Sequence, residues 1–184
     1  MAKPVAPRGE ARARVLEAAL ELFSSQGVSG TSLQMIADRI GVTKAAVYFQ
    51  FHTKEEILEA LIAPAFARVS DLVAVAQAEP DPTHRREIAL RGLVDLVVDH
   101  RRGAALMHMD PAAHAFLEQH RPFKEPINAL ALLLGGGDAR GRVRFACFAG
   151  GAMLCGVNPE LRDIDDSTLR SALHDIGTRL LLEP

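Results

Sequence analysis

Apolar residues recur three or four positions apart along most of the chain, which is the spacing that places side chains on one face of an α-helix. The first such run extends from Arg12 to Gln26 and stops at Gly27, a residue type that favours the C-terminal end of a helix. No segment shows the strict alternation of apolar and polar residues that is typical of a β-strand. The pattern predicts an all-α chain of about nine helices without internal repeats.

Short polar motifs predict where the next helices begin. "TSLQ" at 31–34 is expected to form a capping box, in which the Thr31 hydroxyl and the Gln34 side chain satisfy free backbone donors. Thr43 is expected to cap the segment "KAAVYFQ", and "TKEE" at 53–56 predicts a second capping box. Because proline lacks a backbone donor and clashes one turn back, Pro64 is expected to kink or end the helix that follows.

The remaining helices are predicted from similar signals. Asp-Pro pairs at 81–82 and 110–111 combine a capping carboxylate with a proline suited to the first helical position. They predict helices at about 82–101 and 111–120. Further helices are expected at "INALALLL", which "GGG" at 135–137 would end, and at about 139–157 and 166–182.

The segment "ADRIGVT" joins two short predicted helices and has the pattern of a helix-turn-helix. Ala37 is small enough to let the helices cross closely, Gly41 allows a tight turn, and the apolar Val42 would fill the angle between them. In the second helix Val47 and Phe51 are four residues apart, so they share a face that we expect to pack inward.

The opposite face of that second helix then presents Lys44, Ala45 and Tyr48 to the outside. An exposed tyrosine beside a lysine and small residues suits the surface of a nucleic-acid groove better than a surface in contact only with water. Charge agrees with this placement without proving it. Residues 1–54 contain seven Lys or Arg and four Asp or Glu, a net charge of +3, whereas 55–184 contain fourteen and nineteen, a net charge of −5.

Composition narrows the class of protein further. A chain of 184 residues with 48% hydrophobic content suits one globular unit or a small module joined to a larger one. No long uncharged apolar run and no secretory signal is recognisable, so we expect a cytoplasmic protein without a membrane partner. Cys147 and Cys155 lie eight residues apart in one predicted helix, about 12 Å along its axis. That separation is too large for a disulfide, and both are expected to be buried apolar residues.

Residues 15–62, "VLEAALELFSSQGVSGTSLQMIADRIGVTKAAVYFQFHTKEEILEALI", resemble the DNA-binding domain of the tetracycline-repressor (TetR) family of bacterial transcriptional regulators. The resemblance rests on "AALELF…G", "TS…IA…GV", "YxxF" and "KEEIL". It implies a helix-turn-helix DNA-binding domain of three helices at 1–53 and a helical domain for effector binding and dimerisation at 54–184. It also implies a sequence-specific regulator, by the family's habit a repressor that an effector releases from its operator.

The resemblance assigns DNA contacts residue by residue. Thr31 and Thr43 would meet phosphates at helix N-termini, and Lys54 would reach a phosphate from the following helix. The family often has Gly and then Ser or Thr after the lysine, whereas this chain has Ala45 and Ala46, so direct base readout is expected to be sparse. The full set of expected DNA-contacting residues is Thr31, Gln34, Thr43, Lys44, Ala45, Ala46, Tyr48, Phe49, Gln50, His52 and Lys54.

A single short reading helix contacts only a few base pairs, so useful affinity needs two copies on one duplex. The last two predicted helices carry apolar and small residues that could pair with a second copy or fill the chain's own core. The resemblance favours pairing as a four-helix bundle in a twofold homodimer. The expected interface residues are Ala146, Gly150, Gly151, Leu169, Leu173, Ile176 and Leu180.

The resemblance also implies a pocket for an apolar small-molecule effector among the middle helices, with His100 or Asn128 as polar contacts. For any single one of these residues, an ordinary place in the core is the more frequent role. The effector would act by favouring a state in which the two reading heads are spread apart, with Pro64 as a candidate pivot. The expected lining residues are Phe66, Leu93, Leu96, Val97, His100, Met107, Phe116, Phe123, Asn128, Phe145 and Phe148.

Two alternatives to a small-molecule effector stay open. Histidines at 100, 108, 114 and 120 lie near acidic residues and could form a metal-sensing site, with His114 and Glu118 as a ligand pair on one helix face. The spacing matches no known zinc motif. A protein partner could instead control the regulator. An enzyme is not expected, because the chain has no GxSxG motif and "GGGDARG" lacks the Lys-Ser/Thr of a phosphate-binding loop. No cofactor is expected.

Overall fold

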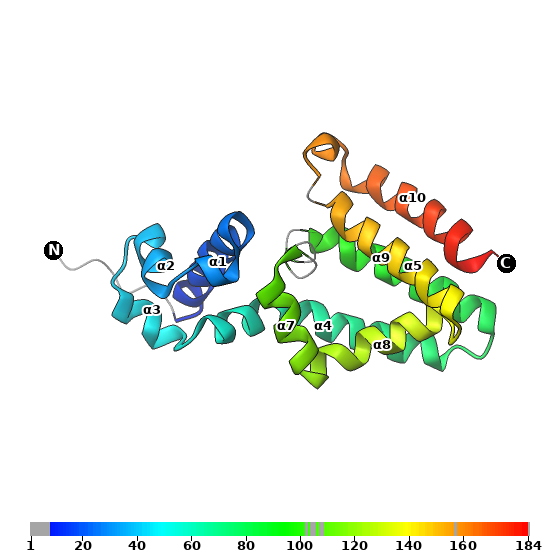
Figure 1. The fold of residues 1–184 in the computed structure, drawn as a ribbon, viewed down its shortest axis with the longest axis horizontal. Coiled ribbons are helices and arrows are strands. Elements are labelled where there is room, and N and C mark those ends of the chain that lie inside the picture. Colours follow the sequence, from blue (N-terminus) through cyan, green and yellow to red (C-terminus); the bar gives the residue numbers. More distant parts are fainter. Residues whose placement is uncertain (1–7, 102, 104–105, 107–108, 157, 184) are drawn as a thin grey trace.

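The computed structural model of the chain describes residues 8–183 except 102, 104–105, 107–108 and 157. The described residues form nine α-helices with defined bounds, one 3₁₀ turn and one π-helical segment, and none of them is in a strand. The predicted all-α class is confirmed. Figure 1 shows an elongated molecule in which the first three helices form one end and the helices after residue 82 form the other.

The N-terminal end contains the helices around the predicted helix-turn-helix. Their bounds are α1 (Arg8–Gly30), α2 (Leu33–Ile40) and α3 (Lys44–Gln50), and the long α4 (Lys54–Ala78) then crosses to the other end of the molecule (Figure 1). Gly27 interrupts α1 with a φ of 79° and a ψ of 161°. This left-handed region favours glycine, so the predicted helix end at Gly27 is seen as a kink.

Two of the predicted caps at this end are confirmed and one is displaced. Thr43 and Thr53 are the N-caps of α3 and α4, and their hydroxyls accept from Ala46 N at 3.2 Å and Glu56 N at 3.1 Å. The cap of α2 is Ser32, whose hydroxyl accepts from Met35 N at 3.2 Å, so the prediction of Thr31 as the cap is wrong. The Gln34 side chain donates to Asp38 at 2.7 Å instead of closing a capping box.

Of the two outcomes expected at Pro64, a kink or a helix end, the helix end is wrong, because α4 continues to Ala78. The C-terminal end of the molecule packs α4 against the remaining helices, and most of their bounds agree with the predicted ranges. These elements are α5 (Pro82–Asp99), α7 (Pro111–Gln119), α8 (Arg121–Gly135), α9 (Ala139–Cys155), η1 (Pro159–Leu161), α10 (Asp166–Gly177) and η2 (Thr178–Leu182). None of the described helices combines the length and the apolar character that crossing a membrane would need.

Two hydrophobic cores hold the structure. The first joins α1, α2, α3 and the first half of α4, and it also includes Leu106, residues of α7 and Phe123 of α8. The second joins the rest of α4 to α5, α8, α9 and α10. Helix α4 contributes to both cores, and α7 packs against α1, so the reading end and the larger helical end are connected by packed side chains as well as by the chain itself.

Candidate DNA-reading surface and effector cavity

The turn between α2 and α3 has the geometry that the sequence predicted. Gly41 has a φ of 70° and a ψ of 38°, a left-handed conformation that L-residues with a side chain rarely adopt. Its amide and that of Val42 donate to carbonyls in the last turn of α2, at 3.3 Å to Asp38 O and 3.0 Å to Ala37 O. Ala37 is fully buried at the crossing of the two helices. The helix-turn-helix is therefore confirmed.

The second helix of this motif, α3, is held by its inner face and exposes its outer face. Val47 and Phe51 are buried against α1, α2 and α4, as the four-residue spacing predicted. On the other side Tyr48 is 52% exposed and Phe49 is 77% exposed. Rings this exposed bury little apolar area when the chain folds, so they stay accessible to another molecule.

Two arginines of α1 brace the C-terminal ends of α2 and α3. Arg14 donates to Ile40 O at 2.9 Å, where α2 ends with free carbonyls. Arg12 donates to Gln50 O at 3.5 Å at the end of α3, and its guanidinium lies 4.1 Å above the Phe51 ring. Sequence reasoning missed both arginines, because neither lies near its partner along the chain.

The structure places the other residues expected to contact DNA in different surroundings. Thr43, Lys44, Ala45, Ala46 and His52 are exposed around the reading helix together with Tyr48 and Phe49, and Gln34 is exposed on α2. Gln50 is half-buried. His52 lies edge-on to the Tyr48 ring, with the ring centres 4.7 Å apart. The exposed side chains among them are accessible to DNA.

Thr31 and Lys54 have partners within the protein. Thr31 is only 2% exposed, and its hydroxyl donates to Gly27 O at 2.8 Å, so its predicted role as a phosphate contact is wrong. Ser32 occupies the exposed cap position instead. The Lys54 ammonium donates to Val28 O at 2.7 Å and Ser29 O at 3.3 Å, which ties the start of α4 to the end of α1.

The larger helical end contains a cavity of about 580 Å³. This volume is in the range of sites that bind small molecules. Its apolar wall comes from α4, α5, α7, α8 and α9, and it also includes Leu20 of α1 and Leu61 and Ile62 of α4. These three residues pack with the core of the reading end, so the cavity touches both ends of the molecule.

Seven residues of the expected effector site line this cavity: Phe66, Leu93, Leu96, Val97, His100, Asn128 and Phe145. Phe116, Phe123 and Phe148 are buried and are not among the lining residues, so the prediction is wrong for these three. Met107 lies outside the described residues. Sequence periodicity missed other wall residues, among them Ala65, Val69, Ile127 and Met153, because a cavity wall and a filled core have the same apolar pattern.

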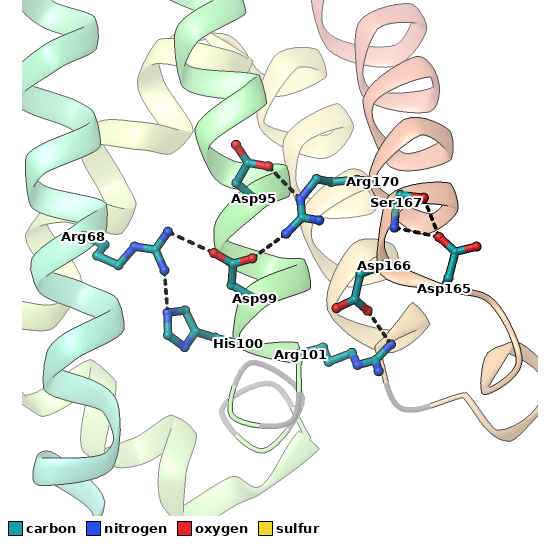
Figure 2. Close-up of polar contacts among 9 residues, drawn as sticks. All are labelled: Arg68, Asp95, Asp99, His100, Arg101, Asp165, Asp166, Ser167 and Arg170. Atoms are coloured by element: carbon teal, nitrogen blue, oxygen red, sulfur yellow. Dashed lines mark hydrogen bonds and ion pairs between the residues drawn. The ribbon is translucent and has the colours of Figure 1, made fainter.

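Charged groups gather at the C-terminal end of α5, beside the cavity, and hold three helices together (Figure 2). Arg170 of α10 pairs with Asp95 at 2.8 Å and also contacts Asp99. Arg68 of α4 pairs with Asp99 at 3.0 Å. Desolvation tends to raise the pKa of Asp99, but its hydrogen bond with Arg68 and the charge of Arg170 outweigh this effect and lower the pKa below its ordinary value.

A single carboxylate links α7 to α1. One oxygen of Asp110 caps α7 by accepting from Ala112 N and Ala113 N, both at 2.9 Å. The other oxygen accepts from Val28 N at 2.9 Å, across 82 residues of sequence. The sequence predicted the cap but gave no sign of the contact with α1.

The outer faces of α9 and α10 expose a row of small and apolar side chains. On α9 this row contains Ala146 and Gly151, as expected, together with Val143, Cys147 and Leu154, while Gly150 on the same face is half-buried. On α10 Ile176 is 55% exposed. Leu180, in the η2 segment, is half-buried. Leu169 and Leu173 point inward and are buried in the second core, so their predicted place in an interface is wrong, and the prediction that Cys147 is buried is also wrong.

The metal alternative finds no support in the described part of the chain. No group of three or more His, Cys, Asp or Glu residues there is arranged to hold a metal ion. Glu118 pairs with Lys124 rather than with His114, and His120 stacks on Phe116 with the ring centres 3.8 Å apart. His108 lies outside the described residues.

The described residues thus combine an exposed helix of a helix-turn-helix with a helical body that contains an apolar cavity. The family model "Bacterial regulatory proteins, tetR family" matches residues 15–61. Over 61 residues the chain is 48% identical to the HTH-type transcriptional regulator SrpR of Pseudomonas putida, a match that covers 33% of this chain and 29% of SrpR. These matches show that the reading end is similar to the DNA-binding domain of TetR-family regulators.

Solved structures agree over nearly the whole chain. A TetR-like transcriptional regulator from Rhodococcus sp. RHA1 has a TM-score of 0.64 and 22% identity, covering 95% of this chain and 97% of that one. The regulator FadR from Bacillus subtilis, in complex with stearoyl-CoA, has a TM-score of 0.62 and 14% identity, covering 94% and 98%. Identities this low establish the shared fold alone.

The curated relatives match mainly through the reading end. The chain spans less than half the length of SrpR and of the two curated relatives that follow it in similarity. All of these relatives are named as transcriptional regulators, which agrees with the expectation that the chain is not an enzyme.

Proposed function

We propose that the protein is a homodimeric transcriptional repressor that binds operator DNA through α3 and is released by an apolar small molecule bound in the cavity. The observation that carries this proposal is the shared wall of the cavity. Leu20, Leu61 and Ile62 contribute both to the cavity and to the core that supports the reading helix. A molecule in the cavity therefore touches the elements that position the DNA-reading surface.

The DNA-reading role is supported by what α3 exposes. Lys44 supplies a positive charge at the start of the helix, and Tyr48 and Phe49 supply aromatic edges that can contact bases, sugars or thymine methyl groups. No acidic residue lies in α3. Ser32 replaces Thr31 as the exposed hydroxyl at the start of α2, and we assign the phosphate contact there to Ser32.

The dimer is supported by the exposed row on α9 and α10. Small residues such as Ala146, Gly150 and Gly151 allow another helix to approach closely, and Val143, Leu154 and Ile176 supply apolar area around them. A row of this kind would be costly to leave in water but becomes favourable when it is covered by the same row of a second copy. Two reading heads would then meet one face of a duplex.

The release step follows from a population shift. A ligand can lower DNA affinity only as far as it binds better to the conformation that cannot fit the operator. Helix α7 offers one path, because Leu117 lines the cavity while Asp110, at the start of the same helix, holds Val28 of α1. A ligand that displaces α7 would thereby move α1 and the reading head.

The test is a gel shift with the DNA upstream of the gene, at several salt concentrations and with non-specific competitor. The expected result is a specific complex whose affinity falls steeply with salt, since phosphate contacts release counterions. The variant Lys44→Ala should weaken binding and lower the salt slope by about 0.9 if the lysine contacts one phosphate. The control Arg162→Ala removes one exposed positive charge from the other end of the molecule and should bind normally.

If Lys44→Ala and Arg162→Ala had the same DNA affinity and the same salt slope, α3 would not be the helix that contacts DNA. If non-specific competitor abolishes the binding of the wild type, the operator lies elsewhere. A selection from random DNA would then supply the probe. A selection that enriches no sequence would overturn the proposal.

A further inference from the structure

The centre of the exposed face of α3 is apolar. An α-helix turns by about 100° per residue, so Ala45 and Phe49 each lie about 160° around the axis from the buried Val47. Both residues therefore point away from the protein, one helical turn apart. Ala45 is exposed, and Phe49 is 77% exposed, more than any other large apolar side chain among the described residues. Together they form one methyl-and-phenyl patch.

The side chains of α3 that can form hydrogen bonds lie to the sides of this patch. Lysine and arginine can bind guanine through two hydrogen bonds, and asparagine and glutamine can bind adenine in the same way. Of these four residue types α3 contains only Lys44 and Gln50. Each lies about 60° around the axis from Val47, much closer to the inner face than to the patch, and Gln50 is half-buried. The hydroxyl of Tyr48 is also on a side of the helix, about 100° from Val47.

The major groove of DNA offers one apolar group to such a patch. A helix-turn-helix places its second helix in that groove, with side chains against the edges of the bases. Most atoms of those edges are hydrogen-bond donors or acceptors, and the exception is the C5-methyl group of thymine. A phenyl ring over a guanine or cytosine edge would take water from polar atoms without replacing their hydrogen bonds, which is costly. A phenyl ring over a thymine methyl group buries two apolar groups together.

The length of the patch sets how many bases it covers. Four residues of helix extend about 6 Å along the axis, and successive base pairs of B-DNA are about 3.4 Å apart. The methyl group of Ala45 and the ring of Phe49 therefore reach about two neighbouring base pairs.

We propose that Ala45 and Phe49 read thymine C5-methyl groups at two neighbouring base pairs in each half of the operator. The inference rests on the proposed function, because it concerns the same reading helix. It names the chemical feature of the operator that α3 recognises, which is a methyl group and not a pattern of donors and acceptors. Ala45 and Phe49 are thus the residues that determine specificity, while Lys44 and Tyr48 contact DNA beside them.

The test replaces thymine by uracil, one position at a time and symmetrically in both halves of the operator found in the gel shift or in the selection. Uracil pairs with adenine and keeps the O4 acceptor, so only the methyl group is removed. Two neighbouring thymines in each half should be sensitive, and each contacted methyl group removed should weaken binding about fourfold. The salt slope should not change, because the phosphate contacts stay the same.

Variants connect the sensitive positions to α3. Phe49→Ala should lose the sensitivity to uracil at one of the two positions, whereas a loss caused by altered DNA shape would persist in the variant. Measurements at lower salt keep its affinity in range. The control Leu132→Ala removes a 62% exposed apolar side chain from α8 and should keep the wild-type profile. At the position that Phe49 reads, a 5-methylcytosine–guanine pair should bind about fourfold tighter than a cytosine–guanine pair.

The outcomes separate this inference from the proposed function. Specific binding that changes by less than about twofold at every uracil position would overturn the inference and leave DNA binding by α3 intact. A uracil profile that is the same in Phe49→Ala as in the wild type would do so too. If selection enriches no sequence, or if Lys44→Ala and Arg162→Ala behave alike, the proposed function fails, and the inference fails with it. An effector that does not release the DNA would contradict the proposed function alone.

Discussion

The carboxylate of Asp110 allows the link between α1 and α7 to be tested apart from the folding of either helix. In Asp110→Ser the hydroxyl can still cap α7, but no second oxygen reaches the amide of Val28. In Asp110→Ala both the cap and the link are lost. Comparing the two variants therefore separates a local effect within α7 from the contact with the reading end.

The structure gives an estimate for each loss. Removing an N-cap costs about 0.5–2 kcal/mol. A hydrogen bond from an amide to a charged group contributes about 1.5–3 kcal/mol when it is buried. Asp110 is half-buried, so we take the lower part of that range, while Val28 is buried and its amide would lose its partner. We expect Asp110→Ser to lower the free energy of unfolding by about 1–2 kcal/mol and Asp110→Ala by about 2–3 kcal/mol.

The assay is urea unfolding followed by circular dichroism, with the midpoint and slope compared among variants. Asp81 supplies a matched control, because it caps α5 in the same Asp-Pro arrangement, accepting from Thr83 N at 2.9 Å and His84 N at 2.8 Å. Among its described hydrogen bonds none reaches another helix. Asp81→Ser should therefore change stability by less than about 0.5 kcal/mol.

The reasoning would be refuted if Asp110→Ser and Asp81→Ser had equal effects, because the link to α1 would then contribute nothing.

Three further predictions concern other parts of the molecule. Ala146→Glu places a charge on the exposed row of α9 and should convert a dimer into a folded monomer in light scattering, whereas Ala115→Glu on the exposed side of α7 should not; a dimeric Ala146 variant would contradict the proposed interface. Phe49→Ala should weaken specific DNA binding about tenfold or more with little change in the urea midpoint, because the ring is 77% exposed; loss of stability instead of binding would contradict its role. Because Arg68 and Arg170 hold the pKa of Asp99 below its ordinary value of 3.8, its stabilisation is present above that pH and is lost as the pH falls through the folded value. The difference in urea midpoint between wild type and Asp99→Asn should therefore be constant from about pH 5 to 7 and shrink below about pH 4, and a constant difference at all pH values would show that the ion pairs contribute nothing.

The sequence alone determined the features that depend on neighbours a few residues away. The caps at Thr43 and Thr53, the Asp-Pro helix starts and the glycine turn at Gly41 all follow from hydrogen bonds or backbone angles within one helical turn. The inward face of α3 also followed, because Val47 and Phe51 are one turn apart on a helix too short to bury any other face. The resemblance to the TetR family rested on these same positions.

Tertiary structure decided which role each of several residues of the same chemical type has. Phe66 and Phe116 have the same chemistry in the sequence, but only the packing of the helices puts the first at a cavity and the second in a core. These outcomes depend on which helices meet, and apolar periodicity indicates that a face is covered without indicating what covers it.

The same limit explains the contacts that join distant segments. Val28 meets Asp110 across 82 residues, and Arg170 meets Asp95 across 75. The sequence shows that such residues are charged or can cap a helix. It does not show their distant partners, which are set by the way the two cores share α4. The reading end could therefore be predicted from the sequence in some detail, whereas the cavity and its link to α1 required the folded chain.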